Sequence, residues 1–263
     1  MDFKKEEYML EKLATPVGEP IVLILASEKF KNEQAVLVQI FRYEDDANDY
    51  FAIRCAEMPE DGDVTSAQFS VTTNAFHFSV TKKQSNQSSN VGSVKLGPTS
   101  TVSVTGDLAN RGLGSFGYSR CIEYIQKKYS DYSVASVKLS SSFPNEQSEW
   151  ERRNHFYQNF NFELEFSDEN NIGSGRAKAA SVSVLTTHYS KNLRELTLVE
   201  FQQEQCEQQR QKQLAQKADE KARAEKALQF QKKPNRMRFW AWIFWIVVLI
   251  IFLQRLMTFI PAD

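Results

Sequence analysis

Residues 105–115 read Thr-Gly-Asp-Leu-Ala-Asn-Arg-Gly-Leu-Gly-Ser, and they lie between a stretch with strand character and one with helical periodicity. Glycine has no side chain, so a glycine-rich turn lets another molecule approach the backbone closely. The first N–H groups of the following helix have no partner inside the helix, and their partial positive charge favours an anion. The turn therefore predicts a phosphate or pyrophosphate site on the backbone of residues 110–115.

The segments around this turn indicate the fold class. Before the turn, residues 3–13 are predicted to be a short amphipathic helix, and strand character is seen at 21–25, 36–43, 50–56, 68–73, 76–81 and 101–104. Short polar connections between strands favour antiparallel neighbours. After the turn the pattern predicts a helix at 115–129, a strand at 133–139, a helix at 146–160, and strands at 161–166 and 179–186. The sequence predicts an α+β fold with a mixed, mostly antiparallel sheet flanked by helices.

Residues 112–117, Gly-Leu-Gly-Ser-Phe-Gly, also match the G-x-G-x-x-G pattern of dinucleotide-binding proteins. That pattern belongs in a parallel βαβ unit, with an acidic residue about 20 positions further on. Here the preceding strands are predicted to be antiparallel, and the next strand runs into Leu139 and serines at 140–142. This context argues against a dinucleotide site.

The turn resembles the acetyl-CoA loop of the GNAT superfamily of N-acetyltransferases, whose pattern is Q/R-x-x-G-x-G/A. Residues 112–114, Gly-Leu-Gly, fit the second half of that pattern. Residues 153–162, Arg-Asn-His-Phe-Tyr-Gln-Asn-Phe-Asn-Phe, are similar to the R-N-x-F-Y-x-x-x-G-F segment of the same superfamily. The resemblance covers residues 101–166, and more loosely 20–186, in the order strand, glycine turn, helix, strand, helix, strand.

The resemblance implies acetyl-CoA as co-substrate and an amine on a protein or small molecule as acceptor. Residues 102–108 would pair with the pantetheine arm as an added strand does, and Asn154 would contact that arm. Tyr157 would protonate the departing thiolate, in a site that excludes water. The pyrophosphate would be held by the turn residues Asn110, Arg111, Gly112, Leu113, Gly114 and Ser115.

A second interpretation is a catalytically inactive binding module on the same scaffold, which recruits a partner to the membrane. Ala109 stands at the Q/R position of the loop pattern, and Asn161 replaces the glycine of the G-F pair. Strands are predicted where the superfamily has two helices beside the acceptor. No general base is identifiable, because Asp107 near the turn is equally explained as a turn or capping residue.

The C-terminal third differs in composition from the first 191 residues, which form the predicted acyltransferase domain. Residues 192–233 are rich in Gln, Glu, Lys, Arg and Ala and predict a polar helical stalk. Residues 234–263 predict a transmembrane anchor, because a helix over 239–260 would be about 33 Å long, enough to contact membrane lipid throughout the hydrocarbon core. Basic residues before this segment predict a single-pass membrane protein with its N-terminal domain in the cytoplasm. A structural protein that self-associates through these helices is a third interpretation.

Charge and cysteine content exclude some other classes of function. The 263 residues carry a net charge of −1, which gives no reason to expect nucleic acid as a partner. Cys55, Cys121 and Cys206 are far apart and match no metal-ligand spacing, so no metal is predicted.

Overall fold

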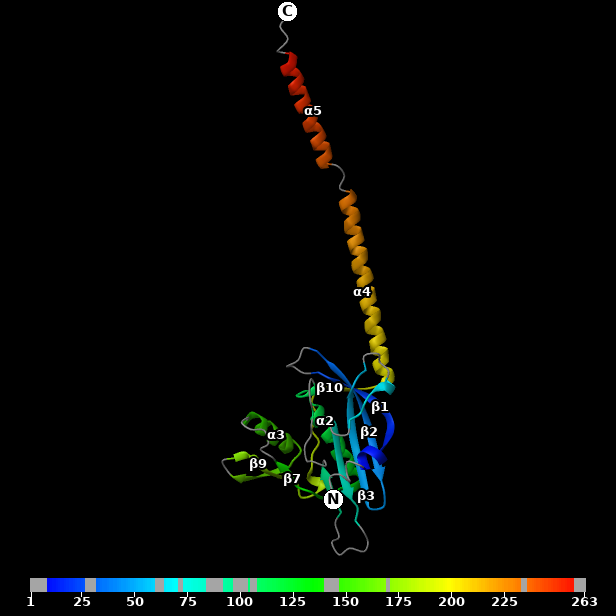
Figure 1. Cartoon of the computed structure of the whole chain (residues 1–263), viewed down its shortest axis with the longest axis vertical. Coiled ribbons are helices and arrows are strands. Elements are labelled where there is room, and N and C mark those ends of the chain that lie inside the picture. Colours follow the sequence, from blue (N-terminus) through cyan, green and yellow to red (C-terminus); the bar gives the residue numbers. More distant parts are fainter. Residues whose placement is uncertain are drawn as a thin grey trace, which may run out of the picture. The chain divides into compact units, whose positions relative to one another are not determined.

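The computed structural model describes residues 9–26, 32–59, 64–70, 73–83, 92–96, 104, 108–139, 147–168, 171–232 and 236–257 (Figure 1). The chain divides into two compact units, Met1–Phe201 and Gln202–Asp263. The first unit contains the sheets and the candidate site, and the residues described in the second unit are helical.

The larger sheet of the first unit has seven strands in the order β10-β1-β2-β3-β4-β5-β6. Its strands are β1 (Thr15–Leu25), β2 (Gln34–Glu44), β3 (Asn48–Glu57), β4 (Ala75–Thr81), β5 (Ser93–Leu96), β6 (Ser133–Val134) and β10 (Leu193–Thr197). Neighbours are antiparallel throughout except for β5 and β6, which are parallel.

A smaller antiparallel sheet of three strands has the order β7-β9-β8. Its strands are β7 (Val137–Leu139), β8 (Glu163–Asp168) and β9 (Asn171–Lys178). Residues 135 and 136 alone separate β6 from β7, so one extended segment pairs first with β5 and then with β9. The predicted strand at 133–139 therefore exists but is shared between two sheets.

Two helices of the first unit follow the strands that meet at this division. Helix α2 (Leu113–Tyr129) follows β5, and helix α3 (Gln147–Asn159) follows β7. Shorter helical turns are η1 (Met9–Leu13), η2 (Val64–Ser66) and η4 (Val182–Val184). The helices expected at 115–129 and 146–160 are confirmed within two residues at each end.

Helix α2 packs on one face of the larger sheet, and every second residue of a strand points toward that face. On β4 the alternating Phe76, Phe78 and Val80 are buried in the same cluster as Phe116 and Ile122 of α2. A second, smaller cluster on the strands includes Val22, Ile24, Leu37 and Ala56 and is covered in part by Phe69 and Phe201. The strand pattern of period two thus produces two packed layers.

Several predicted strands differ from the structure. Residues 67–70 form no strand, and residues 179–186 contain η4 in place of a strand. Strand β5, which was not predicted, precedes α2, and residues 101–103 of the strand expected at 101–104 lie outside the described residues. Strands β9 and β10 were not predicted, and β10 occupies residues assigned to the start of the polar stalk. Of the N-terminal helix expected at 3–13, residues 3–8 lie outside the described residues.

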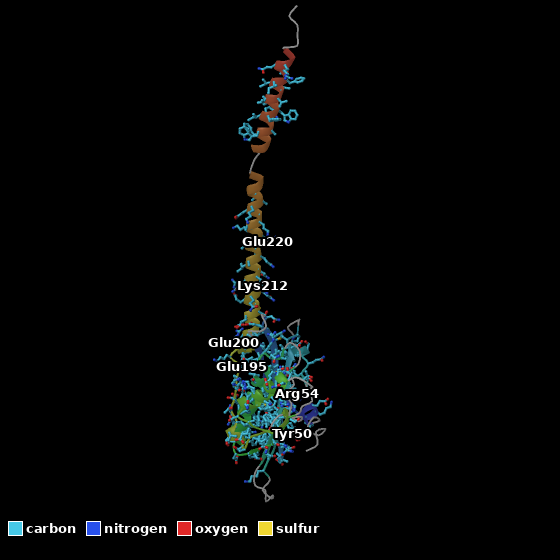
Figure 2. All side chains as sticks on the ribbon, turned by 90° about the vertical axis from the view of Figure 1, so that its left-hand side faces the viewer. Tyr50, Arg54, Glu195, Glu200, Lys212 and Glu220 are labelled. Carbon is cyan, nitrogen blue, oxygen red and sulfur yellow. The ribbon has the colours of Figure 1, made fainter. Side chains whose placement is uncertain are left out.

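The second unit contains most of α4 (Leu198–Lys232) and all of α5 (Arg236–Met257). Side chains such as Lys212 and Glu220 project from α4 along its length (Figure 2). Within the described residues, no helix has the length and hydropathy needed to cross a lipid bilayer. The uncharged run at 239–253 corresponds to about 22 Å of helix, less than a hydrocarbon core of about 30 Å, and Gln254 and Arg255 follow it.

That finding contradicts three linked predictions: the transmembrane helix in the predicted fold, the single-pass membrane location, and the cytoplasmic placement that followed from it. The prediction counted residues 239–260 as one span although Gln254 and Arg255 interrupt its apolar sequence. The α+β class with a mostly antiparallel sheet and flanking helices is the part of the fold that the structure has.

Candidate functional site

The glycine turn leads directly into α2. Asn110 and Gly112 both have left-handed backbone conformations, with φ of 61° and 86°, and Gly112 is the N-cap residue of the helix. The amide of Phe116 donates to the Gly112 carbonyl oxygen at 3.0 Å, which closes the first helical turn. Residues 105–107, including Asp107, lie outside the described residues. The helix N-terminus predicted from the sequence is therefore present at the expected place.

The Arg111 side chain points into the protein. It is 3% exposed, and its guanidinium donates to the Asn32 carbonyl oxygen at 2.7 Å and to Asn32 Oδ1 at 3.2 Å. A further bond of 3.4 Å reaches the carbonyl oxygen of Leu25 at the end of β1. Arg111 thus fastens the turn to the β1–β2 connection.

Gly112 is covered by a later part of the chain. A Cβ atom placed on it would lie 2.6 Å from Cβ and 3.1 Å from Oγ of Ser190, and 3.7 Å from Cδ1 of Leu193. The space beside this glycine is filled by the chain itself. Further along the turn, Leu113 is buried, and Gly114 and Ser115 are partly exposed.

The third glycine of the pattern brings α2 close to the sheet. A Cβ atom on Gly117 would lie 2.1 Å from Cδ2 of Phe76 and 2.3 Å from Cγ of the same ring. Such distances are far inside ordinary contact, so the helix can approach β4 this closely because residue 117 has no side chain. The glycine spacing therefore has a packing role.

Asn154 lies on α3, and both ends of its side-chain amide are used inside the protein. Its Oδ1 accepts from Arg153 Nε at 3.1 Å and Nη2 at 2.9 Å, and its Nδ2 donates to the carbonyl oxygen of Ile172 at 3.1 Å. Arg153 also donates to the carbonyl oxygens of Ile172 and Gly173 on β9. Asn154 is 6% exposed and joins α3 to β9.

Tyr157, one helical turn further along α3, is 4% exposed and packed among aromatic rings. Its ring lies edge-on to Tyr118 of α2 at 6.2 Å between centroids, and to Phe162 at 5.7 Å. Burial raises the pKa of Tyr157 to about 12, although the charge of Arg153 acts in the opposite direction. At neutral pH this phenol is protonated and can act as a proton donor.

The structure brings the turn and α3 together. Arg152 Nη1 donates to Asn110 Oδ1 at 2.8 Å, which joins residue 110 to the helix that carries Asn154 and Tyr157. No sequence pattern singled out Arg152, because an arginine on a polar helix face is ordinary. The candidate site is the region bounded by the turn, by α3, and by the point where β5 and the β6–β7 segment separate.

The connection between α3 and β8 contains a residue with a left-handed backbone conformation. Asn161 has φ of 64°, a left-handed conformation that glycine adopts freely and asparagine tolerates better than most residues. Its side chain donates to the carbonyl oxygen of Val184 at 2.7 Å. The backbone at Asn161 therefore has a conformation that glycine would also adopt.

Two buried polar groups outside this region were not noticed in the sequence. The first is Asp49 at the start of β3, whose carboxylate accepts from the hydroxyls of Tyr129 at 2.7 Å and Tyr124 at 3.0 Å, and from Lys128 Nζ at 3.2 Å. Burial favours the neutral acid, but the hydrogen bond from Tyr129 and the bond and charge of Lys128 outweigh it, so the pKa of Asp49 is lowered. This cluster ties the β2–β3 hairpin to the end of α2.

The second is His77 on β4. Both of its ring nitrogens are buried, and they have no hydrogen-bond partner within the described structure. Burial, followed by the charges of Arg54 and Lys95, lowers the pKa of His77 to about 3. Arg54 lies on β3, as Tyr50 does (Figure 2). The guanidinium carbon of Arg54 is 4.0 Å from the centre of the Phe41 ring. His77 is therefore a neutral imidazole at physiological pH.

Among the described residues, no group of three or more His, Cys, Asp or Glu side chains is placed to hold a metal ion. Cys55 and Cys121 are buried free thiols whose pKa values are raised by burial, and Cys206 is exposed on α4. The chain matches no protein-family model, and no curated protein and no solved structure is significantly similar to it.

Proposed function

We propose that the first unit is an acyl-CoA-dependent N-acyltransferase domain, built as in the GNAT superfamily, that transfers an acetyl group to an amine. The observation that carries the proposal is the division of the sheets. Strand β5 is parallel to β6 over Ser93–Ser133 and Val94–Val134, and then the β6–β7 segment leaves it to join β9. Strand β5 itself continues to Leu96 against β4.

Such a division suits a long thioester substrate. Parallel strands that separate leave backbone donors and acceptors on their facing edges, and the amides of a pantetheine arm can pair with them as a short strand would. Residues 97–112 separate β5 from helix α2, and the first amides of a helix have no partner within it, so the amides of Gly114 and Ser115 would suit a pyrophosphate. The cofactor then needs no metal and few specific side chains.

Tyr157 fits the role of proton donor in this reaction. The acceptor amine attacks the thioester carbonyl carbon, a C–N bond forms, the C–S bond breaks, and the CoA thiolate takes the phenol proton. The acceptor nitrogen loses its extra proton to solvent, which also reprotonates the tyrosinate. With a pKa of about 12, Tyr157 is a weaker acid than a thiol in water, so the transfer requires a thiolate made more basic by burial. The Cys121 thiol in this core is an example, because burial raises its pKa.

The proposal is tested by titrating the full-length chain with acetyl-CoA in a calorimeter and by following free CoA release with a thiol reagent over a panel of amines. Binding in the micromolar range and amine-dependent thiol release are expected. Tyr157→Phe is expected to bind acetyl-CoA as before and to lose about 10²-fold in turnover. Tyr189→Phe, which removes a surface phenol bonded to Glu123, is the matched control and should leave turnover unchanged. Absence of heat with millimolar acetyl-CoA would remove the proposal.

The second candidate is a binding module without catalysis. Three observations favour it: Ser190 fills the space beside Gly112, both ends of the Asn154 amide are engaged within the protein, and Arg111 is turned inward. Under this alternative the chain binds CoA compounds, but Tyr157→Phe and the unaltered chain release thiol at the same background rate. The two candidates are therefore separated by one pair of rate measurements.

A further inference from the structure

Tyr118 of α2 occupies the centre of an aromatic cluster between α2 and α3. The residue is 5% exposed, and its ring lies 4.8 Å from Phe160 and 5.3 Å from Phe156 between centroids. Tyr157 is the neighbour in this cluster that the proposed reaction uses, at 6.2 Å and nearly perpendicular. An aromatic ring packed in this way needs no hydroxyl group for its contacts.

The hydroxyl of Tyr118 is buried and has no hydrogen-bond partner within the described part of the chain. Three other phenols of this unit are hydrogen-bonded. Those of Tyr124 and Tyr129 donate to Asp49, and that of Tyr189 donates to Glu123. A buried polar group without a partner is destabilising, so native proteins rarely contain one unless a water or a ligand completes it.

The position of Tyr118 indicates which group of a ligand would accept a hydrogen bond from its hydroxyl. Tyr118 and Tyr157 belong to one continuous core cluster with Val94 and Leu96 of β5 and with Leu139 of β7. These strands flank the division where the proposed thioester would lie. The rings of Tyr118 and Tyr157 are neighbours, with centroids 6.2 Å apart. A thioester whose sulfur meets Tyr157 would bring the carbonyl oxygen of the adjacent carbon toward Tyr118, and a phenol is a suitable donor for it.

We propose that Tyr118 donates its hydroxyl proton in a hydrogen bond to the carbonyl oxygen of the bound acyl thioester, and thereby distinguishes acyl-CoA from free CoA. This inference rests on the proposed function. Free CoA lacks the acyl carbonyl, so it leaves the Tyr118 hydroxyl unsatisfied. When free CoA binds, the buried hydroxyl stays unpaired, and this difference alone makes free CoA bind more weakly than acyl-CoA. Burial also raises the pKa of Tyr118 well above its usual value, so the group is a donor throughout the physiological range.

The test compares the affinities of acetyl-CoA and CoA for the full-length chain and for Tyr118→Phe, which keeps the ring. The expected result is that Tyr118→Phe weakens acetyl-CoA binding about fivefold, as for one lost neutral hydrogen bond, and leaves CoA binding within about twofold. Tyr189→Phe is the control, and it should bind both compounds as the unaltered chain does. A melting temperature at or above that of the unaltered chain is expected for Tyr118→Phe, since it removes an unsatisfied polar atom.

Each result decides the matter. Equal affinities of Tyr118→Phe and the unaltered chain for acetyl-CoA would overturn the role of Tyr118 and leave the proposed function standing. No binding of either compound to the unaltered chain would overturn both. Should Tyr118→Phe fold poorly, the fluorine resonance of 3-fluorotyrosine at position 118 provides a second measurement. It should shift on adding acetyl-CoA and not CoA, and equal shifts for both would contradict the inference.

Discussion

Replacing Gly117 by alanine adds one methyl group at the closest approach of α2 to the sheet. That methyl carbon would lie 2.1, 2.3 and 2.6 Å from Cδ2, Cγ and Cε2 of Phe76. Comfortable carbon–carbon contact is about 3.5–4.0 Å, so the ring or the helix must move by about 1.4 Å or more. Phe76 is 2% exposed and belongs to the main core, so its ring cannot swing into solvent.

The expected loss in free energy of unfolding follows from two opposing effects. Alanine in place of glycine inside a helix stabilises by about 1 kcal/mol, while forcing extra volume into a packed core costs about 1–3 kcal/mol, occasionally more. The displacement required here is large and the obstructing atoms belong to the Phe76 ring, so the destabilisation by overpacking should lie near the upper end of this range. We expect Gly117→Ala to lose about 1–2 kcal/mol, or about 2–8 °C in melting temperature.

The assay is urea denaturation of the first unit, followed by near-ultraviolet circular dichroism of its buried aromatic residues. A double-mutant cycle with Phe76→Leu provides the control, because the smaller side chain removes the ring that meets the new methyl group. The two changes together should be less destabilising than the sum of the separate effects by about 1 kcal/mol or more. A melting temperature of Gly117→Ala above that of the unaltered chain would refute the reasoning.

Two further predictions concern buried ionisable groups and use urea denaturation at several pH values. Asp49→Asn should lower the free energy of unfolding by about 2–4 kcal/mol at pH 7, because the hydroxyl of Tyr129 and the ammonium of Lys128 lose a charged acceptor. Since the pKa of Asp49 is lowered in the fold, that stabilisation is present above about pH 4 and disappears as the pH falls. An equal loss at pH 3 and pH 7 would contradict this prediction. Burial in the fold lowers the pKa of His77 to about 3, against about 6.5 in the unfolded chain, so the folded state loses stability as the pH drops below about 6.5. Between pH 7 and pH 5, the free energy of unfolding of His77→Leu should therefore fall by about 2 kcal/mol less than that of the unaltered chain. Parallel pH curves for the two chains would show that His77 does not titrate in this way.

The elements with strong periodicity were predictable from the sequence. Helix α2 carries buried residues at helical spacing with charged residues in its last turn, and both its ends were placed within two residues. Strands β2, β3 and β4 are rich in β-branched and aromatic residues, and the connection from β2 to β3 has three residues, so the antiparallel meander was also predicted. Short strands such as β5, β6 and β10 have too few residues to show alternation, and their existence depends on partners far away in the chain.

The helices that carry the candidate residues were predictable, but the contacts of those residues were not. The helix that follows the Gly112 turn and the helix with Tyr157 were both predicted within two residues, because their local sequence signals are strong. What covers Gly112 is Ser190, almost 80 positions further on, and what engages Asn154 is a β9 carbonyl. Contacts between distant segments leave no mark in a single sequence. The unsatisfied hydroxyl of Tyr118 is of the same kind, since a buried tyrosine in a helix is unremarkable until its partners are known.

The short parallel pairing of β5 and β6 also bears on how the first unit moves. Two register pairs hold these strands together, reinforced by the Ser133 amide on the Gly92 carbonyl and the Ala135 amide on the Val94 carbonyl. About 40 residues, including all of α2, separate the partners along the chain, so this seam closes late in folding and has few bonds to resist opening. Its backbone amides should exchange with deuterium earlier than those of β2 and β3. Brief separation along it would free β6 from the larger sheet while the strands from β10 to β5 and the smaller sheet keep their pairing.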